Sequence, residues 1–325
     1  MKRIVGSGLR KNPNTLPTIF DFFSCLFIVG MAFIPQGLWG FYFCFYGVFV
    51  AILGFNQPDV RKSYMPSLTL LSLIALCGLF IHSFLWSVNS ITFRYLNFYL
   101  MFEGFAYVFF GCLTFQTLTA KGTNLRLFFL TLPIALIPYV KQSLYSGRGS
   151  IVFAMAGAFI IFCFLRGRRD LAYLMAILAA TFLVLKFDWF CMKFACRIPI
   201  WKDMIFSQNP SPICSGIALH PFVGQGFNRL LVPDNMLIST SWGKTWLWMH
   251  NDYLNLIRIL GISAIIPIAL FIKTMLKRVR DSFYLIPVLG IAILCFVQAT
   301  VMQGDRALAV MCILALAYVE TYKEE

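Results

Sequence analysis

The chain has 325 residues, of which 60% are hydrophobic and only 12% are charged, and its mean hydropathy is +0.79. A soluble domain carries about twice that charged fraction, so the composition excludes an ordinary soluble globular protein. The net charge of +14 comes from short Lys and Arg clusters between apolar segments, with no RNA-binding or zinc-finger signature, which argues against a nucleic-acid partner.

Apolar segments of transmembrane length follow one another along most of the chain. They predict an all-α fold, a single-domain polytopic integral membrane helical bundle over residues 1–325 with about ten transmembrane helices. We expect the first segment to be retained as a span rather than cleaved as a signal. The predicted spans are residues 18–33, 38–53, 67–86, 98–118, 127–140, 151–165, 171–187, 253–272, 282–298 and 306–320.

The basic residues predict which way these spans point. The N-terminus and the even-numbered connections are basic, as in Arg166 to Arg169, whereas the short odd-numbered connections are poor in Lys and Arg. The positive-inside rule therefore places both termini in the cytoplasm. Residues 188–252, about 65 in number, then form a long outer loop between spans 7 and 8, in which we expect short interfacial helices.

His250 is the strongest candidate for chemistry in this chain. Its imidazole suits proton transfer near neutral pH, and it stands where the outer loop enters the eighth span. Asn251 and Asp252 follow it directly, and Arg258 lies two turns further along the same helix. His220 and His82 also map to the outer half, where a structural role is the stronger reading for each.

Arginines on the outer side form a second group of candidates, and they include Arg94, Arg148, Arg197 and Arg258. Arginine is costly in lipid, and its planar guanidinium binds phosphate oxygens in a bidentate manner. Arg148 stands among Gly and Ser at the start of the sixth span, where a helix N-terminus favours an anion. Several arginines converging outside indicate a diphosphate ligand; the alternative is snorkelling to lipid headgroups.

The first outer connections lack the acidic residues that a divalent metal would need, so we predict no metal site and no cofactor. The ten cysteines are scattered, and most of them lie in apolar segments as small fillers. Cys191, Cys196 and Cys214 lie in the outer loop, where a disulfide among them is an open alternative.

Four sequence elements, in order, resemble the bacterial O-antigen ligase and polysaccharide polymerase superfamily. Ser146 to Gly149 is similar to the family's Ser-Arg-Gly element, and residues 197–201 (Arg-Ile-Pro-Ile-Trp) are similar to its Arg…Trp element. Residues 220–226 (His-Pro-Phe-Val-Gly-Gln-Gly) resemble its His-Pro…Gly-x-Gly element. His250 and Asn251, followed by nine residues and then Gly261, resemble the ligase pattern, from which Ala264 departs at the last position.

The resemblance implies an inverting, metal-independent glycosyltransferase at the periplasmic face of the bacterial inner membrane. It would move a glycan from undecaprenyl diphosphate to a hydroxyl of lipid A–core, with His250 accepting the acceptor proton. It implies membrane lipids as surroundings and the 188–252 loop as periplasmic. The residues expected in catalysis are His250, Arg197 and Arg148, and those expected to contact substrate are Trp201, His220, Asn251, Arg258 and Arg94.

Alternatives stay open at this point, among them a protein O-glycosylating relative of the same class. A polymerase of the same class would extend a growing lipid-linked glycan, so that only the acceptor differs. A transporter of lipid-linked sugars would need ionisable residues near mid-membrane, where Glu103 stands nearly alone, and it would not need a long outer loop.

The predicted lack of a metal can be tested directly. Because arginines supply the positive charge, EDTA should leave the rate of glycan transfer by purified protein unchanged. Inhibition by EDTA that an added divalent ion reverses would contradict this mechanism.

Overall fold

A computed structural model describes residues 19–31, 33–34, 38–55, 65–87, 94–121, 148–207, 216–224, 226–227, 230–231, 246–247, 251–297 and 304–321. This part of the chain is helical apart from turns and one short strand pair, which confirms the predicted all-α class. The principal helices are α1 Ile19–Met31, α2 Trp39–Phe55, α4 Pro66–Ser87, α5 Arg94–Lys121, α7 Arg148–Leu165, α8 Arg169–Leu185, α9 Phe187–Phe206, α10 Asp252–Leu260, α11 Ile265–Val279, α12 Leu285–Val297 and α13 Gly304–Glu320.

Within the described ranges, no helix is both long and apolar enough to cross a membrane.

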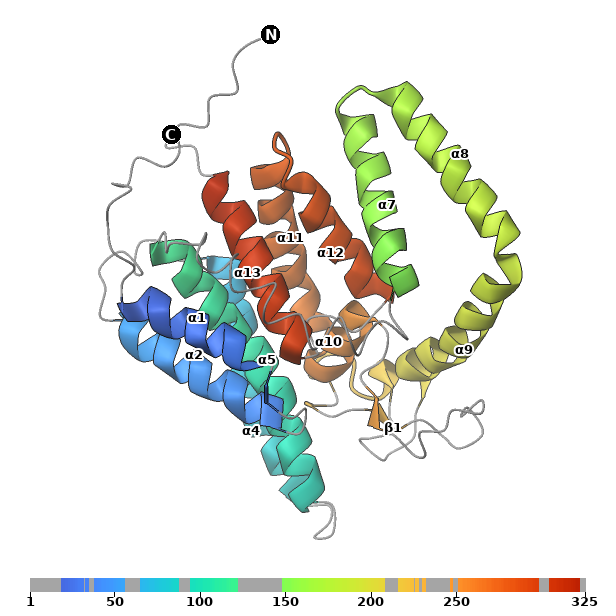
Figure 1. Ribbon diagram of the computed structural model, residues 1–325. Helices are drawn as coiled ribbons and strands as arrows, with labels where there is room; N and C mark the ends of the chain where they lie inside the picture. The colour runs from blue at the N-terminus through green and yellow to red at the C-terminus, as the bar shows by residue number, and fades with distance from the viewer. Residues whose placement is uncertain are drawn as a thin grey trace.

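Helix α5 lies in the middle of the bundle and packs against α2, α4 and α13 (Figure 1). Small residues let the helices approach closely. A Cβ atom on Gly47 of α2 would overlap the ring of Phe110 in α5, and one on Gly290 of α12 would come within 2.9 Å of the Met155 sulfur in α7. The core is accordingly continuous from α2 through α5 to α13, with Ala106, Phe115 and Ala315 fully buried.

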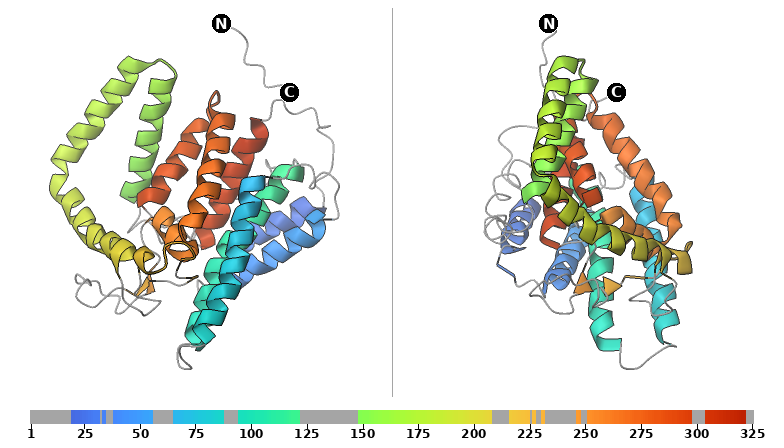
Figure 2. Two further views of the ribbon diagram at one scale, coloured as in Figure 1. Left: turned by 180° about the vertical axis from the view of Figure 1, so that it is seen from behind. Right: turned by 90° about the vertical axis from the view of Figure 1, so that its right-hand side faces the viewer.

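Helices α7, α8 and α9 form an arch beside this bundle (Figures 1 and 2). α7 packs along α12, whereas the packing neighbours of α8 are α7 and α9. A Schellman motif ends α7: the amide of Arg168 donates to the Cys163 carbonyl at 2.9 Å, and Gly167 adopts φ 73°. The chain then reverses sharply into α8.

The helices fall on the predicted apolar segments, with two differences. The segment predicted as one span over 253–272 is two helices, α10 and α11, separated at Gly261 and a 3₁₀ turn, η4 (Ile262–Ala264). The first part of the expected outer loop forms the 20-residue helix α9. The predicted span 127–140 lies outside the described residues.

The two ends of the molecule differ in character. The α7–α8 turn, the α11–α12 turn and the C-terminal end of α13 lie at one end (Figure 1). The other end holds α10, the last turns of α9, the 3₁₀ helix η2 (Ile217–Leu219), and the antiparallel pair of strands β1 (Leu230–Leu231) and β2 (Trp246–Leu247). Helices α5 and α7 also begin on the side of this second end (Figure 1).

Candidate functional site

Helix α10 carries an unusual set of buried polar side chains. Asn251, Asp252, Asn255 and Arg258 are each at most 3% exposed, and Arg258 is among the largest fully buried side chains in the described residues. Residues 251, 255 and 258 are spaced by four and three, so they share one face of the helix. Burying a charged group is costly unless polar partners compensate it, so such a face is rare in an apolar bundle.

Asn251 sets the start of α10. Its backbone is extended (φ −165°, ψ 104°), and its side-chain oxygen accepts a hydrogen bond from the Leu254 amide at 3.0 Å. This is the N-cap arrangement that asparagine favours, and it satisfies one of the amides left without a partner at a helix start. The conformation of Asn251 is therefore fixed by its cap on the helix.

Gly261 sets the end of α10. Its amide donates to the Ile257 carbonyl at 2.7 Å, and it adopts φ 78° with ψ −179°, a conformation open almost exclusively to glycine. The chain then turns through η4 and enters α11. The single span predicted over 253–272 was wrong here because its apolar pattern continues past Gly261, while the backbone conformation of this glycine interrupts the helix.

The turn at 220–226 fills this interruption. The Ile262 amide donates to the Pro221 carbonyl at 2.7 Å, and the Gly226 amide donates to the Ile259 carbonyl at 3.1 Å. These bonds satisfy backbone groups that the broken helix leaves exposed. The His220–Gly226 element and the Asn251–Gly261 element are therefore a single structural unit.

The two backbones approach so closely that side chains are excluded between them. A Cβ atom on Gly224 would overlap the backbone of Ile259 and Gly261, and one on Gly261 would overlap the backbone of Phe222. Gly224 also has φ 75°. Both glycines are thus required by the same contact, which explains why a glycine stands in each element.

Phe227 anchors the end of this turn. Its side chain is fully buried, and its ring meets that of Phe105 in α5 edge to face, with centroids 5.7 Å apart. Such aromatic pairs stabilise by about 0.5–1.5 kcal/mol beyond their burial. The turn is therefore held by the core of the bundle as well as by α10.

Helix α9 brings the Arg-Ile-Pro-Ile-Trp element to the same region. Met204 is fully buried and packs with Trp201, Ile200 and Leu254, the last of which belongs to α10. Trp201 also meets Phe296 of α12, with ring centroids 5.8 Å apart. The element is thus attached to α10 and α12 through its tryptophan side, and Arg197, one turn earlier, is partly exposed.

An apolar cavity of about 140 Å³ lies beside α10, between α4, α5, α11, α12 and α13. Asp252, Tyr253 and Leu256 contribute to its wall from α10, and the Tyr253 hydroxyl donates to the Ala292 carbonyl at 3.0 Å. An apolar cavity of roughly 150 Å³ is large enough to admit benzene. This one can therefore hold a short apolar group next to a buried carboxylate.

The structure describes some of the expected site residues only in part. His250 lies outside the described residues, directly before Asn251. Arg94 and Arg148 are the first residues of α5 and α7, but their side chains are not among those described. His220 is exposed at the end of η2, and Cys191 is a free thiol. The side chain of Cys196 is not described, and Cys214 lies outside the described residues.

Sequence reasoning missed two features of this region. Asn255 was not selected, although its position four residues after Asn251 and three before Arg258 is the signal that would have found it. The contact between Gly224 and Gly261 was also missed, because the sequence around a glycine does not indicate which distant residue lies against it.

No protein-family model matches this chain, and neither the curated proteins nor the solved structures include a detectable match to it.

The close approach at Gly224 can be tested against a matched glycine. Gly167 has nearly the same φ, 73°, but nothing lies within 4 Å of where its Cβ would be. Gly167→Ala should cost only about 1–2 kcal/mol for the left-handed backbone. Gly224→Ala should cost roughly 1–3 kcal/mol more, because the added methyl group is forced against backbone. Thermal unfolding of the two purified variants measures the difference, and equal losses would show that the turn does not pack into the helix break.

Proposed function

We propose that this chain is a multi-pass inner-membrane glycosyltransferase of the O-antigen ligase type. It transfers a glycan from undecaprenyl diphosphate to a hydroxyl of lipid A–core at the periplasmic face, with inversion and without a metal. The observation that carries the proposal is the interlocked backbone of the 220–226 turn and the α10–α11 break. Two elements that resemble one family's motifs meet there around a helix with a buried polar face.

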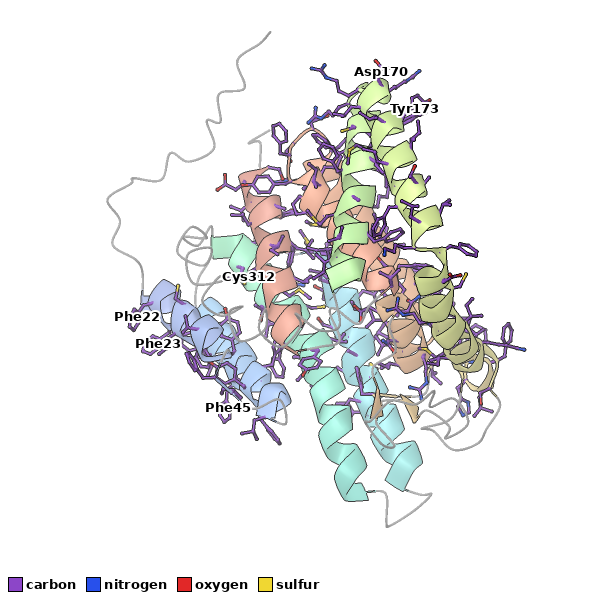
Figure 3. All side chains as sticks on the ribbon, turned by 45° about the vertical axis from the view of Figure 1, so that its right-hand side comes forward. Phe22, Phe23, Phe45, Asp170, Tyr173 and Cys312 are labelled. Atoms are coloured by element: carbon purple, nitrogen blue, oxygen red, sulfur yellow. The ribbon has the colours of Figure 1, made fainter. Side chains whose placement is uncertain are left out.

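The exposed surface supports a membrane location. Large apolar side chains cover the outer faces of α1, α2 and α8, where Phe45 is 70% exposed and Val184 is 74% exposed. Figure 3 shows Phe22, Phe23 and Phe45 pointing away from the bundle, in contrast to the buried Cys312. Soluble monomers rarely expose apolar patches of more than a few hundred Å². Lipid acyl chains would cover these faces.

The arrangement of the two ends supports the proposed orientation. The basic turns around Arg168 and Arg280 lie at the end opposite α10 and the 220–226 turn. When the end that carries these basic turns lies in the cytoplasm, as the positive-inside rule requires, α10 faces the periplasm.

The proposed reaction is a displacement at the anomeric carbon of the donor glycan. The acceptor oxygen forms a bond to this carbon as the bond to the diphosphate oxygen breaks, and its electron pair leaves with undecaprenyl diphosphate. His250 takes the proton of the acceptor hydroxyl. Arg197 and Arg148 stabilise the negative charge that develops on the diphosphate, which needs no metal ion. Trp201, His220 and Arg94 position the substrates, and Asn251 and Arg258, which are at most 2% exposed, support them from buried positions at α10.

Substitution of His250 tests the function in cells. A strain lacking this gene should lose the glycan-capped lipopolysaccharide bands on a gel and accumulate polymer on the lipid carrier. The wild-type gene should restore the bands, and His250→Ala should not, although the protein is expressed. Single-unit caps that persist while long chains vanish would instead indicate a polymerase. An unchanged ladder would contradict the ligase proposal.

Arg197 tests the diphosphate site. Arg197→Lys keeps the charge but loses the bidentate fork, so the transfer rate should fall by roughly 100-fold, as for other lost oxyanion donors. Lys202→Gln, an exposed cation on the same helix, is the matched control and should retain the wild-type rate. Equal activity of Arg197→Lys and wild type in a purified transfer assay would remove Arg197 from the site.

A further inference from the structure

The end of the bundle opposite α10 concentrates positive charge. Two turns meet there, the α7–α8 turn and the α11–α12 turn, and acidic side chains are few in both. We call their exposed cations, together with those of the adjoining helix ends, the basic end. Its members are Arg166, Arg168, Arg169, Lys277 and Arg280, and the neighbouring acids are Asp170, Asp281 and Glu320, the last at the end of α13.

Side-chain contacts hold the two turns together. The Phe162 ring of α7 meets the Phe283 ring of the α11–α12 turn, with centroids 5.6 Å apart. The Arg166 guanidinium lies over the same Phe162 ring, 5.4 Å from its centroid. Because α7 also packs along α12, the cations of both turns belong to one surface rather than to two separate loops.

Aromatic side chains also lie at this end of the bundle. Phe283 is 74% exposed, and Tyr173 is also exposed, one turn after the α7–α8 turn. Figure 3 shows Tyr173 and Asp170 together at the tip of α8. Arg278 lies over the Tyr318 ring of α13 at 4.5 Å, which places a third aromatic side chain at this end. Tyrosines are enriched at the boundary between membrane and water, where lipid headgroups lie.

We propose that the basic end is a binding surface for the headgroups of anionic phospholipids. Guanidinium groups bind phosphate oxygens strongly, and each cation near an anionic membrane surface contributes about 1 kcal/mol, or roughly fivefold in affinity. The exposed rings of Phe283 and Tyr173 lie beside the cations, where they contact the glycerol and upper acyl region. The inference rests on the membrane part of the proposed function and is independent of glycosyl transfer.

Thermal unfolding in a neutral detergent measures this binding. Phosphatidylglycerol should stabilise the wild-type protein at lower concentrations than phosphatidylcholine, since ligands stabilise the state that they bind. The double variant Arg168→Gln/Arg280→Gln should raise the half-saturating phosphatidylglycerol concentration roughly 25-fold, from two cations at about fivefold each. Both side chains are exposed, and that of Arg168 makes no capping hydrogen bond, so the fold should persist.

The matched control is Lys186→Gln/Lys202→Gln, which removes two exposed cations at the end of α8 and on α9. It should leave the half-saturating concentration within about twofold of wild type. The charge-preserving pair Arg168→Lys/Arg280→Lys should remain within about threefold, which separates lost charge from lost fold.

Three results would overturn the proposal. They are an equal response to phosphatidylcholine, an equal loss in the control pair, and saturation by inorganic phosphate alone, which would indicate a free anion as the ligand. Carbonate extraction of membranes tests separately whether the protein is embedded in the membrane, because only an integral protein stays in the membrane pellet. A protein that stays in the pellet but gives one of the three results above would contradict lipid binding alone. Loss of transfer in the gel assay would not bear on lipid binding.

Discussion

The contact between two stretches of backbone, around Gly224 and Gly261, determines the architecture of the candidate site. Without the 220–226 turn, the break between α10 and α11 would leave the Ile259 carbonyl and the Ile262 amide without their hydrogen bonds. A buried backbone group left unpaired costs about 1–3 kcal/mol, so the break and the turn stabilise each other. The turn and the helix break each depend on hydrogen bonds from the other, and together they position α10 at one end of the bundle.

This arrangement explains how α10 can present a polar face inside an apolar molecule. Asn251 fixes the start of the helix, Gly261 fixes its end, and the short segment between them keeps Asn255 and Arg258 on one buried face. Helix α9 adds Arg197 and Trp201 from the arch, attached through the Met204 cluster. A site built this way is held by the core rather than by loops, which suits chemistry that depends on fixed geometry. The basic end lies at the opposite end of the helices from α10.

Sequence predicted most of the helices because apolar segments of this length leave few other choices. It also selected Asn251 and Arg258 from their spacing relative to His250, and both prove to be buried on α10. It did not predict the break in the eighth segment, since hydropathy is insensitive to a single glycine at φ 78°. It did not pair Gly224 with Gly261 either, because a long-range backbone contact leaves no periodic trace in one sequence. The chemical roles of His250, Arg197 and Arg148 remain predictions.

The central structural claim is that the 220–226 turn sits in the α10–α11 break, and disulfide cross-linking tests it most directly. The hydrogen bond between the Ile262 amide and the Pro221 carbonyl brings these residues close enough for a disulfide, which needs Cα atoms roughly 4.4–6.8 Å apart. The pair Pro221→Cys/Ile262→Cys should therefore cross-link on mild oxidation, as read by mass spectrometry of the linked peptides. The pair Pro221→Cys/Ile266→Cys, with the second cysteine moved one turn along to the exposed Ile266 position, should not. Linkage of the first pair alone is the predicted result. Failure of the first pair, or equal linkage of both, would show that the turn lies elsewhere and would remove the structural support for a joint site.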